Sequence, residues 1–109
     1  MTVRELICEG GFRVISPGDR EDRKVDTVFC CDLLSVAMGR APSGCAWVTV
    51  MGNMNTLAVA SLTDAACVIL AEGAVLDEAA EKKAREQGIA VLATEEPIFE
   101  TALDIYKRL

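Results

Sequence analysis

The sequence predicts an α/β fold, arranged as three α/β/α layers around a mostly parallel sheet of about five strands. Short apolar runs rich in β-branched residues alternate with segments of helical pattern, as in parallel sheets that helices cover on both faces. Residues 46–73 show this alternation almost without filler. Because the chain has 109 residues, we expect one domain spanning residues 1–109.

The central unit comprises a strand over Ala46–Met51, a turn at Gly52–Asn55, a short helix over Thr56–Leu62 and a strand over Cys67–Ala71. Both strands are mostly apolar, as expected of strands buried on both faces. Glycine tolerates positive φ and asparagine caps helices, so the turn ends the first strand and introduces the helix. A strand–helix–strand unit of this kind is parallel, with a right-handed crossover.

Four elements precede this unit. They are a helix after the Thr2–Glu5 capping box, strands over Phe12–Ser16 and Val25–Cys31, and a helix over Leu33–Met38 that Asp32 caps. The segment between the two strands carries Arg20, Arg23 and Lys24 among acidic residues. Such a mixed run of charges is typical of a solvated loop.

Three elements follow the central unit. Asp77 caps a helix in which acidic residues precede basic ones, in agreement with the helix dipole, and Gly88 ends it. A last strand is predicted over Ile89–Ala93. Thr94 then caps a C-terminal helix with Pro97 in its first turn.

Charge and hydropathy exclude two classes of partner. The formal net charge is −6 and no basic stripe is present, so we expect no nucleic acid partner. No apolar run reaches the ~18 residues that a membrane span requires, so we expect no membrane partner. The first residues lack the apolar stretch of a signal peptide, which predicts a cytoplasmic location.

The five cysteines include no CxxC pair, and the chain has no histidine. We therefore predict reduced, structural thiols, with no metal and no cofactor. A redox or metal protein that uses Cys30, Cys31 and Cys45 is an alternative hypothesis. The lack of histidine excludes Ser–His and Cys–His catalysis, and the adjacent carboxylates Glu95 and Glu96 are poorly placed to cooperate. We predict no catalytic residues and no enzymatic activity.

The best candidate for a binding site is the turn with the start of its helix, formed by Gly52, Asn53, Met54, Asn55 and Thr56. This turn follows a parallel strand, where ligands of open α/β sheets bind and where free amides at a helix start favour anions. The alternative interpretation is that glycine and asparagine only cap the helix.

Four residues from other strand ends should complete the same edge of the sheet: Asp32, Glu72, Gly73 and Thr94. We call this edge, together with the turn at residues 52–56, the carboxyl-end rim. If the two strands of the central unit are adjacent, Glu72 should face the Gly52 turn and could accept hydrogen bonds from a ribose or an amine. The alternatives are an exposed loop carboxylate at Glu72 and a helix cap at Asp32.

The residues of the central unit, together with Gly88–Leu92 and Thr94 before Phe99, resemble a DRTGG domain of the stand-alone type. Such domains are similar to the N-terminal domain of HPr kinase/phosphorylase and, more remotely, to the UDP-binding domain of some Mur ligases. The chain departs from the family at both signature positions. The family's Asp-Arg falls on Asn53-Met54, and its Thr-Gly-Gly falls on Ala71-Glu72-Gly73. The kinase's phosphate-binding loop is absent.

The resemblance implies a regulatory or ligand-sensing role. Together with the turn, it predicts a non-catalytic domain that binds a small anionic or nucleotide-like ligand at the carboxyl-end rim and acts through a partner protein. The alternative is a metabolite-free interaction module, a dimer that docks on a larger enzyme. Two apolar stripes on the last helix, through Ile98 and through Phe99, make a homodimer the expected assembly.

Overall fold

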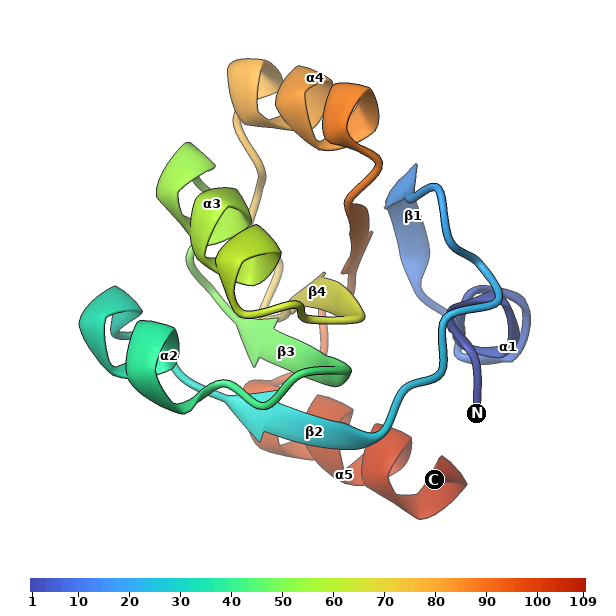
Figure 1. Ribbon diagram of the computed structural model, residues 1–109. Helices are drawn as coiled ribbons and strands as arrows, with labels where there is room; N and C mark the ends of the chain where they lie inside the picture. Colours follow the sequence, from blue (N-terminus) through green and yellow to red (C-terminus); the bar gives the residue numbers. More distant parts are fainter.

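The computed structural model describes all residues 1–109 and contains one five-stranded sheet in the order β1-β5-β4-β3-β2. Its strands are β1 (Arg13–Pro17), β2 (Thr27–Cys30), β3 (Cys45–Thr49), β4 (Cys67–Leu70) and β5 (Ala90–Ala93). Strands β2, β3, β4 and β5 run parallel to one another, whereas the edge strand β1 pairs antiparallel with β5. The predicted α/β fold with a mostly parallel sheet is confirmed (Figure 1).

Five helices occur in the predicted order among the strands. They are α1 (Val3–Glu9), α2 (Leu34–Arg40), α3 (Met54–Leu62), α4 (Glu78–Gln87) and α5 (Ile98–Arg108). None of them is both long and apolar enough to cross a bilayer.

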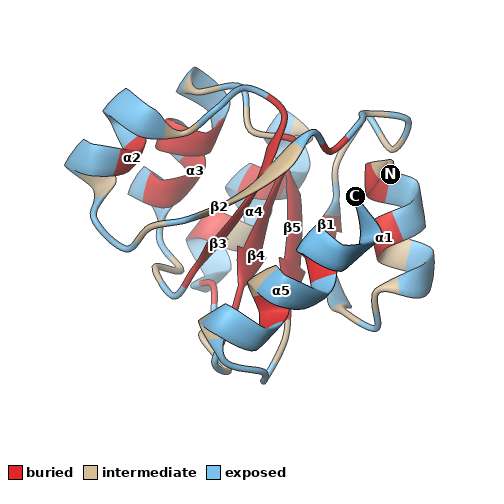
Figure 2. Cartoon of the chain, turned by 90° about the horizontal axis from the view of Figure 1, so that it is seen from below, coloured by how far each residue is buried: buried red, intermediate tan, exposed pale blue.

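The unit β3–α3–β4 is the centre of the molecule, and its strands are parallel, with Trp47 paired to Val68. Every residue of β3 and β4 is buried, which explains why both strands are continuously apolar rather than alternating. Figure 2 shows β3, β4 and β5 buried along their length between more exposed helices. Trp47 is fully buried, and its indole Nε1 donates to the carbonyl of Cys31 at 3.0 Å.

Successive side chains of the central strands enter different hydrophobic clusters, as the alternation of a strand requires. Trp47 and Val68 join residues of α2, α3 and α4 in one cluster. Val48 and Ile69 join residues of α1 and α5 in the other cluster. The sheet is therefore packed on both faces, which fixes the positions of the loops at its two edges.

The local helix signals behave as predicted at three N-termini. The Thr2–Glu5 capping box forms, Asn53 accepts from the amide of Thr56, and Asp77 accepts from the amide of Ala80. The helix α3 begins at Met54, two residues earlier than predicted, because Asn53 itself is the cap.

Two predicted caps are wrong. Helix α2 begins after Leu33, without a side-chain cap, because the Asp32 carboxylate bonds to the end of β3 instead. Helix α5 begins after Pro97 rather than after Thr94, whose hydroxyl accepts from the amide of Glu96 within the preceding loop.

Candidate functional site

The turn between β3 and α3 leaves a row of amides without a protein acceptor. The backbone N–H groups of Gly52, Asn53, Met54 and Asn55 make no hydrogen bond within the chain. The Asn53 side chain satisfies the next amide, that of Thr56, at 3.0 Å. The start of a helix carries partial positive charge as well as free donors, so this turn can hold an anion or a polar group.

One side of this turn is closed by the loop that follows β4. A Cβ atom placed on Gly52 would meet the carbonyl oxygen of Val75 and lie 3.3 Å from the Cα of Leu76. The backbone of Val75–Leu76 therefore packs directly on Gly52, and only a glycine fits there. A ligand must approach the amides from the side of Asn53 and Asn55, both of which are exposed.

Asp32 lies beside the turn and joins two strand ends. Its Oδ1 accepts from the Thr49 hydroxyl at 2.7 Å and from the Val50 amide at 2.9 Å. These bonds tie the end of β2 to the end of β3, and the first of them satisfies the hydroxyl of Thr49, which is fully buried. Asp32 thus supports the geometry of the turn, and its negative charge remains near the free amides.

Glu72 and Gly73 are directed toward α5 rather than toward the Gly52 turn. Their amides donate to the carbonyls of Glu96 at 2.8 Å and Thr94 at 3.0 Å. The Glu72 carboxylate accepts from the amide of Ile98 at 3.4 Å, at the first residue of α5. Although β3 and β4 are adjacent as predicted, the Glu72 carboxylate therefore caps the start of α5 and not the Gly52 turn.

The predicted site residues accordingly form two groups. Asp32 lies with the turn at residues 52–56, whereas Glu72 and Gly73 lie with Thr94. The four loops of the carboxyl-end rim carry carboxylates and no lysine or arginine. These carboxylates are Asp32, Glu72, Asp77, Glu95 and Glu96. Free amides favour an anion at the turn, and the surrounding carboxylates weaken that preference.

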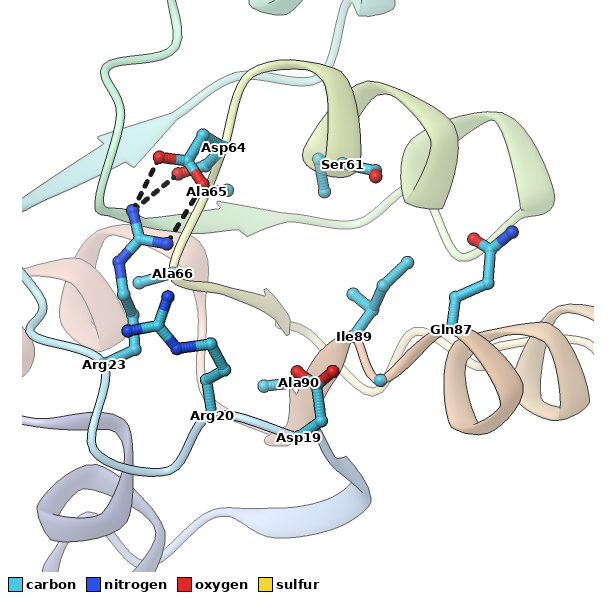
Figure 3. A pocket seen from close by; sticks show the side chains of 13 residues that line it. Asp19, Arg20, Arg23, Ser61, Asp64, Ala65, Ala66, Gln87, Ile89 and Ala90 are labelled. Carbon is cyan, nitrogen blue, oxygen red and sulfur yellow. Dashed lines mark hydrogen bonds and ion pairs between the residues drawn. The ribbon is translucent and has the colours of Figure 1, made fainter.

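The opposite edge of the sheet contains a hollow that the sequence interpretation missed. It has a volume of about 220 Å³ and lies among the loop after β1, the α3–β4 connection and the α4–β5 connection. Figure 3 shows its charged and polar side chains. They are Asp19, Arg20, Arg23, Ser61, Asp64 and Gln87. We call this space the amino-end hollow, because β4 and β5 begin there.

Arg23 and Asp64 form the most extensively hydrogen-bonded part of that hollow. Arg23 donates to the two carboxylate oxygens of Asp64 at 3.0 and 2.9 Å and to its carbonyl at 3.1 Å. Ser43 donates to the same carboxylate at 2.6 Å. Hydrogen bonds from Arg23 and Ser43 lower the pKa of Asp64 to about 2, because they stabilise the charged carboxylate.

The loop with Arg20 and Arg23 was predicted to be solvated, and Arg20 is indeed exposed, but the loop also forms a wall of this hollow. No local motif marks it, because Asp64, which Arg23 binds in the hollow, is 41 positions away in the chain. The available signal was topological: in a parallel sheet, the connections that lead into adjacent strands meet at one edge.

The cysteines are free, and burial disfavours the thiolate form of Cys45 and Cys67. Burial raises the pKa of Cys45 to about 11 and that of Cys67 to about 12. Cys30 stands three register positions from the residue paired with Cys45, so the two are separated by roughly 10 Å along the strands. The structure holds no group of three or more metal-ligating side chains.

Comparison with models of known protein families gives no match, and neither does comparison with curated proteins. The resemblance to DRTGG domains therefore stays a prediction that rests on the residues of the central unit.

Proposed function

We propose that this chain is a non-catalytic regulatory domain that binds a small anionic or nucleotide-like ligand at the carboxyl-end rim. The observation that carries the proposal is the row of unpaired amides from Gly52 to Asn55 at the start of α3. The domain would act through a partner protein in the cytoplasm. The proposal includes a three-layer α/β/α architecture like that of the N-terminal domain of HPr kinase/phosphorylase.

Backbone groups would hold the anionic part of the ligand. Where DRTGG domains have an Asp-Arg pair, this chain has Asn53-Met54, so no guanidinium is available at the turn. The phosphate or carboxylate would instead lie on the amides of Met54 and Asn55, as anions do at other helix starts. Because Val75 closes one side of Gly52, the remainder of the ligand would extend over the exposed side of the turn.

The chemistry of the side chains supports a binding role rather than catalysis. The chain has no histidine. Burial keeps the thiols of Cys45 and Cys67 protonated. The carboxylate of Asp32 already accepts two hydrogen bonds from neighbouring protein groups. A nucleophile next to a general base, which acyl or phosphoryl transfer requires, is not assembled on the rim.

A thermal-shift screen against nucleoside monophosphates and acetyl phosphate tests the proposal. A ligand at about 100 times its Kd stabilises a protein by roughly 2.7 kcal/mol, which should raise the Tm of a domain of this size by about 10 °C. We expect at least one such compound to stabilise the protein. An unchanged Tm with every compound contradicts the proposal.

The double variant Asn53→Asp with Met54→Arg introduces the family's pair and should change which compound stabilises best. Aspartate caps a helix as well as asparagine does, so folding should be retained. Leu62→Arg is the matched control, because Leu62 lies at the far end of the same helix and is 72% exposed. The control should have the ligand preference of the unmodified chain.

A metabolite-free interaction module is the second candidate function. The carboxylates of the rim, unaccompanied by lysine or arginine, fit a basic surface on a larger enzyme. Phe99 and Tyr106 on α5 are 68% and 67% exposed, which suits a homodimer or a docked partner. Affinity capture from the native host with the Asn53→Asp, Met54→Arg protein separates the two functions. A docking module retains its partner, whereas a ligand sensor changes its ligand preference.

A further inference from the structure

The amino-end hollow brings a weakly paired cationic side chain, Arg20, and an unpaired anionic one, Asp19, together on the same short loop. Arg20 has only a loose ion pair with Asp22, at 3.9 Å. The side chain of Asp19 makes no hydrogen bond or ion pair in the chain, and only its backbone amide is used, by Gly88. Both side chains border the hollow (Figure 3).

We propose that this hollow binds a small zwitterion of the α-amino acid class, with Arg20 holding its carboxylate and Asp19 its ammonium group. The guanidinium of arginine presents a planar fork of donors that matches a carboxylate. An aspartate supplies acceptors for the three donors of an ammonium group. The site is separate from the carboxyl-end rim and does not depend on the function proposed there.

The other charged groups that line the hollow already bond to one another. Arg23 is committed to Asp64 through both carboxylate oxygens, so this pair neither attracts nor repels a ligand strongly. The carboxyl group of Asp19 lies over Gly88, where a Cβ atom would be 2.8 Å from the Asp19 Cβ. Because Gly88 has no Cβ, the backbone can pass this close, and its φ of 67° is a second reason for glycine at this position.

The electrostatic surroundings favour a zwitterion over a plain anion. Helices α3 and α4 both end at the hollow, at Leu62 and Gln87. Helix C-termini carry partial negative charge, so they favour an ammonium group and oppose a second carboxylate. Arg20 is the one cation in the hollow without a close partner. The hollow can therefore pair with one carboxylate of a ligand.

Size and lining restrict the ligand further. The volume of about 220 Å³ is below the ~300–1,000 Å³ of pockets that hold drug-sized ligands, so the hollow would enclose a small molecule better than a nucleotide. Small apolar side chains cover part of the surface, namely Ala60, Ala65, Ala66 and Ala90. They suit a small side chain, as in alanine or serine.

Titration of the ¹⁵N-labelled full chain with L-alanine, L-serine, acetate and methylamine, followed by NMR, tests the proposal. Saturable shifts should appear for the amides of Asp19, Arg20, Ala65 and Gly88 with the two amino acids. Acetate and methylamine, which carry one charge each, should give none. Binding of acetate as tight as that of the amino acids overturns the zwitterion assignment. The site itself is overturned if the amino acids shift no amide of the hollow at up to about 10 mM, which is ten times a Kd of about 1 mM.

Two variants test the assigned roles. Arg20→Gln and Asp19→Asn should each weaken amino acid binding by about tenfold or more, the usual cost of losing a hydrogen bond to a charged group. Arg40→Gln is the matched control, because Arg40 ends α2 outside the hollow and is exposed. Undiminished binding in both hollow variants, with the spectrum of a folded protein, contradicts the assignment. The rim variant Asn53→Asp with Met54→Arg should leave this binding unchanged.

Discussion

Arg23 holds Asp64 through two parallel hydrogen bonds, although the two residues are 41 positions apart in the chain. A third bond from Arg23 reaches the Asp64 carbonyl. Asp64 has a φ of 60°, a left-handed conformation that is uncommon outside glycine but is tolerated by aspartate. The pair therefore fixes the connection between α3 and β4 against the loop that follows β1.

Arg23→Gln should destabilise the protein in a pH-dependent manner. The pKa of Asp64 is lowered from 3.8 to about 2 in the folded state, so its contribution to stability is complete above about pH 4 and is lost as the pH falls toward 2. The Asp64 side chain is 63% exposed, so solvent screening leaves a loss of about 1 kcal/mol at pH 7. Urea unfolding at pH 7 and at pH 2.5 should show a loss that is clearly smaller at the lower pH, where part of the folded-state advantage of the Asp64 carboxylate is gone.

Arg4→Gln is the control for this experiment. Arg4 and Glu21 form an ion pair at 3.5 Å, with side chains 63% and 41% exposed. Such a pair contributes less than about 0.5 kcal/mol. An Arg23→Gln effect of the same size at both pH values would show that packing, and not the ion pair, is responsible.

Gly52→Ala and Gly39→Ala should change stability in opposite directions. A methyl group on Gly52 would meet the Val75 carbonyl, so we expect a loss of about 1–3 kcal/mol. Gly39 lies in helix α2 with open space around it, so alanine should stabilise by about 0.5–1 kcal/mol. Urea denaturation measures both, and a neutral Gly52→Ala would show that Val75 does not pack on the turn.

Asp32→Ala should destabilise the protein by about 2 kcal/mol. It leaves the buried Thr49 hydroxyl and the Val50 amide without their acceptor, and unsatisfied buried groups are costly. Asp32→Asn retains a carbonyl oxygen at the same place and should cost less than about 1 kcal/mol. Equal losses in the two variants would mean that charge rather than hydrogen bonding is the contribution of Asp32.

Trp47→Phe should destabilise the protein by about 1–3 kcal/mol. Phenylalanine leaves part of the buried indole volume empty and removes the donor to the Cys31 carbonyl. Circular dichroism during thermal unfolding measures the loss. The fluorescence of the unmodified chain gives an independent check, since Trp47 is its one tryptophan. A blue-shifted emission agrees with burial, and a red-shifted emission contradicts it.

The fold could be predicted from the sequence because its signals are local. The apolar strands at Ala46 and Cys67 and the caps at Asn53 and Asp77 each depend on residues within one or two turns. The strand order depends on contacts between distant segments. The antiparallel pairing of β1 with β5 therefore has no counterpart in any local pattern.

The site was predicted less completely for the same reason. Asp32 and Thr94 have the residue types of helix caps, but Asp32 bonds to Thr49 and Val50, 17 and 18 positions away. The cap of α5 is reinforced by Glu72, 26 positions earlier in the chain. The amino-end hollow is assembled from three separate connections, so no single stretch of sequence indicates it.

The most direct test of the rim proposal is an NMR titration of the ¹⁵N-labelled chain with a nucleoside monophosphate and with inorganic phosphate. Saturable shifts centred on the amides of residues 52–55, which lack protein acceptors, are the predicted result. If those amides remain unperturbed at about 10 mM ligand, well above a Kd of about 1 mM, in a fully folded sample, the ligand-sensing role is contradicted.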